Sequence, residues 1–403
     1  MKFKELGLDD RLLEGISAIG FEDATPVQEQ AIPKIISGKD IIASAQTGTG
    51  KTAAFLLPVI HQILQADDDQ SNIKALIIVP TRELAVQIDQ QMEGLSYFTS
   101  VSSIAVYGGG DGQSFSREKS ALSQGADVII GTPGRLIAHL NLGYVQVSNL
   151  KCLVLDEADR MLDMGFHDDL MKIISYLPKQ RQNLMFSATM PPKIRDLARK
   201  ILQEPDEINI AISKPAERVA QAAFILYDNQ KIPLAKYLLK AKKLQSVIIF
   251  CSTKNSAKQL SKELKKLEFS VEDIHSDLEQ GEREQVLRDF KNKKLSILVA
   301  TDILSRGIDV EDIELVVNYD VPNDGEDYIH RIGRTARAAS KGVAFTFVNE
   351  KEQNKFYAIE KLLETPVPKG KLPASIGEGP EYKPRTGSRS NGRKKYNSRK
   401  KRK

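Results

Sequence analysis

Short apolar runs alternate with helix-like stretches through the first half of the chain. Each run is apolar throughout and ends in a small or polar residue, which is typical of strands buried on both faces of a parallel sheet. Between two of the runs, apolar residues recur at helical spacing, at Leu84, Ile88 and Met92. The pattern predicts a parallel sheet with functional loops at the carboxyl ends of its strands. The runs are 40–46 (DIIASAQ), 75–81 (ALIIVPT), 101–109 (VSSIAVYGG), 127–133 (DVIIGTP), 152–158 (CLVLDEA) and 183–189 (NLMFSAT).

A second series of the same character begins near Val219. We therefore predict an α/β protein with two tandem domains of one architecture, each a parallel sheet flanked by helices, and 403 residues suffice for both. The predicted domains are 1–210 and 218–365, joined by a linker at 211–217. Residues 366–403 begin rich in Pro and Gly and are predicted to be a disordered tail. The runs of this series are 221–228 (QAAFILYD), 246–253 (SVIIFCST), 269–276 (FSVEDIHS), 295–302 (LSILVATD), 315–322 (LVVNYDVP) and 343–349 (VAFTFVN).

Charge is divided unevenly along the chain. Residues 383–403 hold 11 Lys or Arg and no Asp or Glu, while the remaining 47 basic residues face 53 acidic ones, a net charge of −6. A basic run of this density is typical of a disordered segment that attracts polyanions. A tail that serves solubility alone is the alternative.

Other features of the sequence point to the cytoplasm. The apolar runs are too short to span a membrane, and the first residues lack the apolar core of a secretory signal. Cys152 and Cys251 lie in apolar runs, as buried thiols do in a reducing compartment. We predict a cytoplasmic protein with no membrane partner.

Residues 41–52 (IIASAQTGTGKT) read as a strand, a glycine-containing turn and a helix start, the context of a phosphate-binding loop. The usual pattern begins with glycine, and Ala45 replaces it with the smallest side chain. Lys51 can meet the outer phosphates of a nucleotide, and Thr52 can ligate Mg²⁺. The candidate ATP-binding residues of the loop are Ala45, Gln46, Thr47, Gly48, Thr49, Gly50, Lys51 and Thr52.

The run CLVLDEADRML places Asp156 and Glu157 directly after an apolar strand. Asp156 can hold Mg²⁺ through water, and Glu157 can orient and deprotonate the attacking water. Alone, an acidic tetrad after a strand is more often a solvated turn. About a hundred residues after a phosphate-binding loop, it indicates nucleotide hydrolysis.

The tetrad Asp156–Asp159 spells DEAD, and the order of motifs over residues 1 to about 350 resembles that of the DEAD-box RNA helicases. The resemblance implies two RecA-like domains and an RNA-dependent ATPase that uses ATP and Mg²⁺.

The stretch GFEDATPVQ resembles the adenine-recognition motif of that family. By this resemblance Phe21 stacks on adenine and Gln28 reads its edge, because an amide offers a donor and an acceptor together. Phe3 matches the isolated upstream aromatic of the family. Ala24 stands where the family usually has proline.

The second half has no Gly-Lys-Thr loop and is predicted to complete the ATP site. Its stretch YIHRIGRTARAASKG resembles the arginine-finger motif of the family. The resemblance implies that Arg334 and Arg337 reach the γ-phosphate and neutralise charge that develops during transfer. It also implies that His330 and Arg331 brace the interface between the halves.

Two further motifs are likened to coupling elements of the family. ATDILSRGIDV supplies Arg306 for an interdomain contact and Asp309 for the ribose. MFSATMP supplies Ser187 and Thr189, which in the family couple hydrolysis to strand separation.

Motifs in both halves resemble the RNA-binding set of the family. Their hydroxyls, glycine amides and arginines suit phosphate and 2′-OH contacts, and obvious bidentate base readers are lacking, so we expect little sequence specificity. Each motif has a simpler alternative, such as a Gly-Gly turn, a helix cap or a loop arginine. The candidates are Pro80, Thr81, Arg82, Gly108, Gly109, Thr132, Pro133, Gly134, Arg135, Gln280, Arg283 and Thr301.

Together these features predict an ATP-dependent RNA helicase that separates strands locally, without long-range tracking. The short basic tail is similar to that of bacterial RhlE-type members, which implies ribosome assembly or RNA turnover, with ribosomal or RNA-decay proteins as partners. Two alternatives stay open. One is a related motor on DNA; the other is an ATP-gated RNA clamp that seldom turns over.

Overall fold

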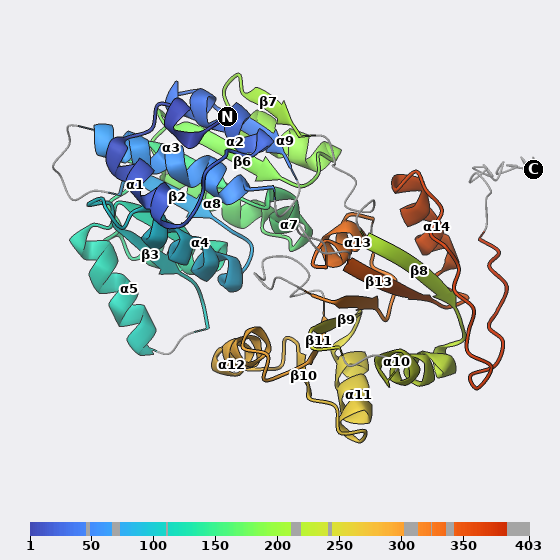
Figure 1. Cartoon of the computed structure of the whole chain (residues 1–403). Coiled ribbons are helices and arrows are strands. Elements are labelled where there is room, and N and C mark those ends of the chain that lie inside the picture. Colours follow the sequence, from blue (N-terminus) through green and yellow to red (C-terminus); the bar gives the residue numbers. More distant parts are fainter. Residues whose placement is uncertain are drawn as a thin grey trace, which may run out of the picture.

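The computed structural model describes residues 1–45, 49–66, 73–109, 112–210, 219–240, 244–301, 313–323, 325–335 and 342–384, apart from the side chains of residues 112, 113, 280 and 326. The first half forms a seven-stranded parallel sheet in the order β3-β4-β2-β5-β6-β1-β7 (Figure 1). Its strands are β1 (Ile41–Ser44), β2 (Ala75–Ile78), β3 (Ser103–Val106), β4 (Val128–Gly131), β5 (Cys152–Leu155), β6 (Gln182–Ser187) and β7 (Asp206–Asn209).

Helices cover both faces of this sheet, because its central strands are apolar at nearly every position. Neighbouring residues of β1 belong to different cores: Ile41 packs under α1–α4, and Ile42 packs under α5–α9. The helices are η1 (Phe3–Glu5), α1 (Asp10–Ala18), α2 (Pro26–Ile36), α3 (Lys51–Gln65), α4 (Arg82–Leu95), α5 (Gly112–Gln124), α6 (Pro133–Asn141), α7 (Ala158–Asp163), α8 (His167–Tyr176) and α9 (Pro192–Ile201).

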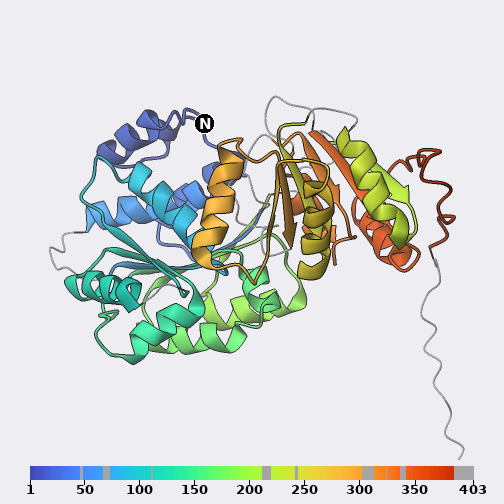
Figure 2. The same cartoon turned by 90° about the horizontal axis from the view of Figure 1, so that it is seen from below.

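The second half is a six-stranded parallel sheet in the order β10-β11-β9-β12-β13-β8, beside the first half in both views (Figures 1 and 2). Helices α10 and α11 cover one face and α12–α14 the other. Its strands are β8 (Val219–Ile225), β9 (Val247–Cys251), β10 (Val271–Ile274), β11 (Ile297–Thr301), β12 (Leu315–Asn318) and β13 (Gly342–Val348). Its helices are η3 (Asp228–Gln230), α10 (Lys231–Lys240), α11 (Lys254–Lys265), α12 (Gln280–Lys291), α13 (Gly325–Ile332) and α14 (Gln353–Leu362).

When the two sheets are aligned from β3 and β10, each strand of the second sheet has a counterpart in the first. Strand β7, at the edge of the first sheet, has no counterpart strand in the second. The predicted fold of two α/β domains, each a parallel sheet flanked by helices, is therefore confirmed. The linker at 211–217 lies outside the described residues, and the exact domain boundaries stay a prediction.

The prediction that residues 366–403 are disordered is wrong for 366–384, which we call the strap. The strap follows the edge strand β8, where Ala223 N donates to Pro368 O and Gly370 N donates to Ala223 O, each at 2.8 Å. Its apolar side chains pack into the second half. Figure 1 shows its backbone running along that half of the molecule. They lack any helical or strand period because the backbone turns between them, so composition alone suggested disorder. Residues 385–403 lie outside the described residues.

Both cysteines are buried thiols, as predicted. Burial raises the pKa of the Cys152 thiol to about 12. In the described ranges, none of the helices combines the length and apolarity needed to cross a bilayer.

Candidate nucleotide and RNA sites

The phosphate-binding loop joins β1 to α3, as predicted. Gly50 is the last residue before α3 and has a φ of 89°, a left-handed conformation that glycine adopts at little cost. As the N-cap residue, Gly50 has no side chain with which to cap α3, so the first N–H groups of the helix can face a phosphate. Thr49 and Thr52 are half-buried beside it. Gln46, Thr47 and Gly48 lie outside the described residues.

Lys51, Asp156 and Glu157 are buried together at the carboxyl edge of the sheet. Burial raises the pKa of Asp156 to about 6, although the Lys51 ammonium opposes the rise. Glu157 precedes α7 with φ 50°, a strained conformation for a non-glycine residue, and its N–H donates to Asp156 Oδ1 at 2.9 Å.

Two atoms of this group fit ATP and Mg²⁺. Lys51 Nζ and Glu157 Oε2 are buried and find no hydrogen-bond partner among the described residues, a costly state that a phosphate and a metal-bound water would relieve. The same residues contain no cluster of three metal-ligating side chains. Mg²⁺ is commonly held by one or two carboxylates together with substrate phosphates, so Asp156 and Thr52 are the residues that would hold it.

Gln28 connects the adenine-recognition motif to the phosphate-binding loop. Its Nε2 donates to Gly50 O at 3.0 Å, and its Oε1 accepts from Thr25 N at 2.8 Å. An amide has two N–H donors and two acceptor lone pairs, so one of each is left for the edge of adenine. These bonds therefore orient the Gln28 amide and leave one donor and one acceptor of it available.

Two aromatic rings lie at the entrance of this motif. Phe21 is 45% exposed, which leaves a ring face for a base. Phe3 is buried beneath it, with ring centroids 6.3 Å apart and planes 19° apart. The upstream aromatic is thus placed to support the stacking residue.

Ser187 and Thr189 lie next to the phosphate-binding loop. Ser187 ends β6 opposite Ser44 of β1, and its carbonyl accepts from Ala45 N at 3.1 Å. Its hydroxyl donates to Thr189 O at 2.8 Å. The pair is therefore connected directly to the nucleotide loop, as a coupling element requires.

The arginine-finger motif is only partly within the described residues. Arg334 and His330 are buried near the end of α13, and Arg306, Asp309 and Arg337 lie outside the described ranges.

Arg331 is placed differently from the prediction that it braces the interface. Its side chain is fully buried in the second half, where Nη1 donates to Asn318 Oδ1 at 3.3 Å and to Asp320 O at 3.1 Å. Its guanidinium also lies 5.1 Å from the ring centroid of Phe250. Arg331 is held inside its own domain because a buried guanidinium needs acceptors, which the end of β12 supplies.

The RNA candidates of the first half gather on neighbouring loops at the carboxyl edge of the sheet. Thr81 caps α4 by accepting from Leu84 N at 3.3 Å, so the simpler alternative of a helix cap holds for its hydroxyl. Gly109 has φ 91°, and a Cβ there would lie 1.8 Å from Arg82 Nη1. Glycine at 109 thus lets the Arg82 side chain pack over the turn. Pro80 is buried, and Gly108 is half-buried.

The turn Thr132–Gly134 is open, but Arg135 is not. Thr132 makes no capping bond, Pro133 is buried as the first residue of α6, and Gly134 is exposed with open space around it. Arg135 Nε donates to Glu118 Oε2 at 2.6 Å, and its side chain is only 14% exposed. In this structure the guanidinium forms an internal ion pair through Nε, and its buried Nη2 has no hydrogen-bond partner among the described residues, so its RNA contact stays a prediction.

The second half brings its own candidates to the same side. Arg283 Nη2 donates to Ser276 O at 2.9 Å, and Thr301 Oγ1 is buried without a hydrogen-bond partner in the described part of the chain. Burial raises the pKa of Tyr107, which precedes the Gly-Gly turn of the first half. The charge of Glu284 on α12 adds to this rise, so α12 is within electrostatic reach of the turn. The side chain of Gln280 is not described.

Sequence reasoning missed Glu118 and His139, which contact Arg135 or its partner. The available signal was a polar pair on one helix, since Arg135 and His139 are four residues apart on α6. Nothing in the sequence placed Glu118 of α5 against them.

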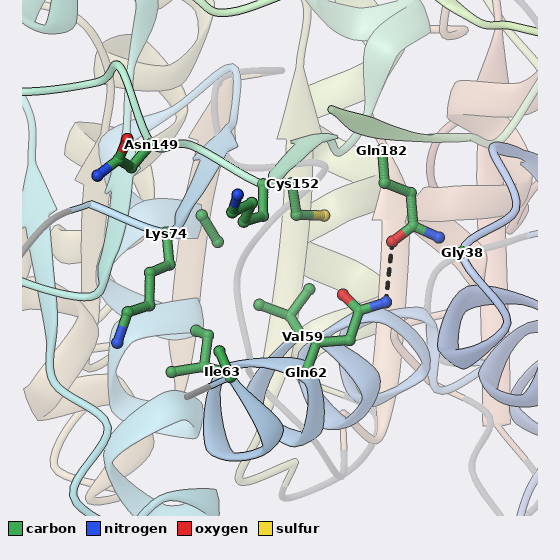
Figure 3. Close-up of a pocket in the computed structure, with 11 residues that line it drawn as sticks. Gly38, Val59, Gln62, Ile63, Lys74, Asn149, Cys152 and Gln182 are labelled. Atoms are coloured by element: carbon green, nitrogen blue, oxygen red, sulfur yellow. Dashed lines mark hydrogen bonds between the residues drawn. The ribbon is translucent and has the colours of Figure 1, made fainter. Parts of the chain in front are cut away.

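A separate cavity of about 250 Å³ lies at the amino ends of the strands (Figure 3). Lys74 and Cys152 line it from the starts of β2 and β5, and Ile63 lines it from the last turn of α3. The amide of Gln62 donates to Gln182 Oε1 at 3.0 Å at its border. Because α3 begins at the phosphate-binding loop and ends here, the cavity is not part of the nucleotide site.

Comparison with known proteins agrees with this arrangement. Residues 25–197 match the family model described as DEAD/DEAH box helicase, and residues 230–339 match the helicase conserved C-terminal domain. The ATP-dependent RNA helicase CshA of Listeria monocytogenes is 43% identical over 361 residues, 89% of this chain and 68% of the relative. A CshA protein of Geobacillus kaustophilus is 39% identical over 92% of this chain and 78% of its own length. Neither is an RhlE-type protein by name, and that subgroup stays a prediction.

Solved structures show the same likeness. Dbp5 of S. cerevisiae bound to RNA and ADP BeF3 has a TM-score of 0.82 and 32% identity, covering 92% of this chain and 95% of that one. Mss116p bound to ssRNA and AMP-PNP has a TM-score of 0.82 and 30% identity, covering 93% and 80%. From its motifs, its paired sheets and these relatives, the chain belongs to the DEAD-box ATP-dependent RNA helicases.

Proposed function

We propose that this helicase uses ATP and Mg²⁺ to separate short RNA duplexes locally, without tracking along the strand. The observation that carries the proposal is that Lys51 Nζ, at the start of α3, and Glu157 Oε2 are both buried and have no hydrogen-bond partner among the described residues. Buried charged groups without hydrogen bonds cost free energy when nothing is bound. A phosphate and its attacking water would supply the missing bonds.

Each residue of the first half has a distinct role in this proposal. The N–H groups at the start of α3 and the Lys51 ammonium orient the phosphates, while Phe21 and Gln28 fix the base. Glu157 holds the attacking water and accepts its proton. Mg²⁺, when bound beside Asp156 and Thr52, supplies charge neutralisation at the phosphate oxygens.

The second half contributes arginines that respond to the γ-phosphate. Arg334 and Arg337 would neutralise charge on the transferred phosphoryl group, so ATP binds best when both halves contact it. Closure would join the RNA-contacting loops of the two halves into one surface. A bent single strand fits such a surface better than a stiff duplex, and loss of the γ-phosphate releases the halves.

RNA is the proposed polynucleotide, with little sequence preference. Dbp5 and Mss116p, whose structures resemble this chain, were solved with RNA or ssRNA bound. The basic residues 383–403 would add salt-dependent affinity, with a log–log slope of roughly 0.7 per single-strand phosphate neutralised. Ribosome assembly or RNA turnover in the cytoplasm, with ribosomal or RNA-decay proteins as partners, is the cellular role we propose.

Steady-state ATP hydrolysis tests the proposal, measured alone, with single-stranded RNA and with DNA of the same sequence. Glu157→Gln serves as the blank. Stimulation by RNA only is the expected result, together with ATP-dependent release of a strand from a short RNA duplex. Equal stimulation by DNA would favour a general nucleic-acid motor. ATP-dependent RNA binding without stimulation or strand release would favour a clamp.

A further inference from the structure

Glu118 of α5 joins two side chains of α6 through one oxygen atom. Its Oε2 accepts from Arg135 Nε at 2.6 Å and lies 2.7 Å from His139 Nε2. His139 is 1% exposed, and its Nδ1 is hydrogen-bonded to the hydroxyl of Tyr144. With Nε2 protonated and Nδ1 accepting from Tyr144, a neutral imidazole satisfies both neighbours.

Phe115 completes this group, which we call the Glu118 cluster: Phe115, Glu118, Arg135, His139 and Tyr144. Its ring stacks on His139 with centroids 4.3 Å apart and planes 11° apart. The Arg135 guanidinium lies 4.5 Å from the same ring. Arg135 is thus held by a carboxylate at Nε and by an aromatic face, while its Nη2 is buried and has no hydrogen-bond partner in the described part of the chain.

Electrostatics explain why α6 needs this partner. Arg135 is in the first turn of α6, where the helix dipole disfavours a cation. Burial opposes ionisation of Glu118, but bonds from His139 and Arg135 outweigh it, so the pKa of Glu118 is lowered. The carboxylate therefore stays charged near neutral pH and offsets the arginine.

We propose that Glu118, Phe115 and His139 are positioning residues that hold Arg135 as a brace for the turn Thr132–Gly134. The turn then meets RNA phosphate through the Thr132 hydroxyl and the N–H groups of α6, while the Arg135 guanidinium makes no phosphate contact. The inference rests on the proposed RNA role of this turn. It differs from the expectation that Arg135 itself binds RNA.

Salt dependence separates the two roles of Arg135. The test measures binding of a fluorescent oligouridine RNA to the full chain with a non-hydrolysable ATP analogue, from about 50 to 300 mM KCl. We expect Arg135→Gln and Glu118→Gln each to weaken binding about 5- to 20-fold at every salt concentration, with the log–log slope unchanged. The double variant should be no weaker than either single one, because both remove the same brace.

Other results would overturn the inference. If Arg135 contacts a phosphate, Arg135→Gln would lower the slope by roughly 0.7. Glu118→Gln would then strengthen RNA binding, because it frees the guanidinium. Failure of the unaltered protein to bind RNA would instead count against the proposed function itself.

Two further variants guard against simple loss of folding. Glu14→Gln removes one exposed carboxylate of α1, has no ion-pair partner among the described residues, and should leave affinity and slope unchanged. His139→Gln keeps an amide donor for Glu118, whereas His139→Leu does not. If the brace matters, only the leucine variant weakens RNA binding more than about threefold; equal loss in both, with thermal unfolding unchanged, contradicts it.

Discussion

The first helix after the first strand begins differently in the two halves. In the first half β1 leads to Gly50, and Lys51 opens α3; in the second half β8 leads to η3, and Lys231 opens α10. Both lysines are buried. Strands β5 and β12 occupy the same place in the two sheet orders, and Asp156 and Asp320 follow them. Lysine and aspartate therefore meet at corresponding positions of the two sheets.

The two ammonium groups differ in what they contact. Lys231 Nζ lies 2.7 Å from Asp320 Oδ1 and 3.4 Å from Glu352 Oε2. Burial opposes its charged form, but Asp320 and Glu352 outweigh burial and raise the pKa of Lys231. Lys51 Nζ has no hydrogen-bond partner in the described ranges. The second half closes this position with its own carboxylates, whereas the first half leaves its cation for a phosphate.

The outer edges of the sheets extend the comparison. In the first half β7 pairs with β1 over four residues, from Ile41–Asp206 to Ser44–Asn209. In the second half the strap takes the same place beside β8, with a single bridge between Ala223 and Lys369. In the chain, β7 follows β6 and α9, and the strap follows β13 and α14, where β6 and β13 hold the same place in the two sheets. The strap is therefore a reduced counterpart of β7 and protects an edge strand from pairing with other chains.

The largest expected effect on stability is at Lys231, the lysine that is paired with carboxylates of its own domain. Lys231→Met leaves the half-buried carboxylates of Asp320 and Glu352 without their buried cation, and we expect the second half to lose about 3 kcal/mol of unfolding free energy. Urea unfolding followed by circular dichroism measures it. A loss below about 1 kcal/mol would mean that the ion cluster is not what holds this end of the sheet.

Lys51, whose ammonium makes no hydrogen bond among the described residues, should behave in the opposite way. Lys51→Met removes an ammonium that makes no hydrogen bond among the described residues and acts on buried Asp156 only through its charge. The loss of unfolding free energy should therefore stay well below that of Lys231→Met, at about 1 kcal/mol. ATP hydrolysis should fall about 10²- to 10³-fold, because charge stabilisation at the phosphates is lost. Unfolding and steady-state hydrolysis are measured on the same preparation. Destabilisation equal to that of Lys231→Met would break the comparison.

Gly50 tests whether the open site depends on a particular glycine. A Cβ at Gly50 would lie 2.5 Å from Gln28 Nε2, whereas Gly38, with a similar φ of 82°, has nothing within 4 Å. Alanine at either position meets a backbone cost of about 1 kcal/mol. Only Gly50→Ala should also displace Gln28 and raise the KM for ATP, by about tenfold, or about 1.4 kcal/mol. Equal KM values in both variants would show that Gln28 does not read the base.

The sequence predicts what is local and misses what is tertiary. Gly50, Lys51 and Asp156 were found because a strand, a turn and a helix start are adjacent in the chain. The sequence does not predict the Glu118 cluster, because its carboxylate comes from another helix. It does not predict the burial of Arg331 either, because a motif specifies residue types and not the direction in which a side chain points. The strap was missed because its bonds to β8 leave no hydrophobic period.

A small effect is expected in the strap, where a single hydroxyl can be removed. Tyr382 donates to Glu360 Oε2 at 2.6 Å, and Lys369 Nζ lies 2.6 Å from Glu360 Oε1. Tyr382→Phe should lower the unfolding free energy of the second half by about 1 kcal/mol, since Glu360 is largely buried and keeps only part of its partners. Tyr357 is half-buried on α14, and no described group accepts from its hydroxyl, so Tyr357→Phe is the matched control.

Chain truncation sharpens the same point about the edge of the second sheet. Ending the chain after Pro384 keeps every described contact of the strap, so unfolding should be unchanged even if RNA affinity at low salt falls. Ending it after Thr365 exposes the outer edge of β8 and the apolar surface that the strap covers. The shorter chain should therefore unfold more easily and self-associate, which analytical ultracentrifugation detects. If it stayed monomeric and as stable as the longer one, the strap would not be the counterpart of β7.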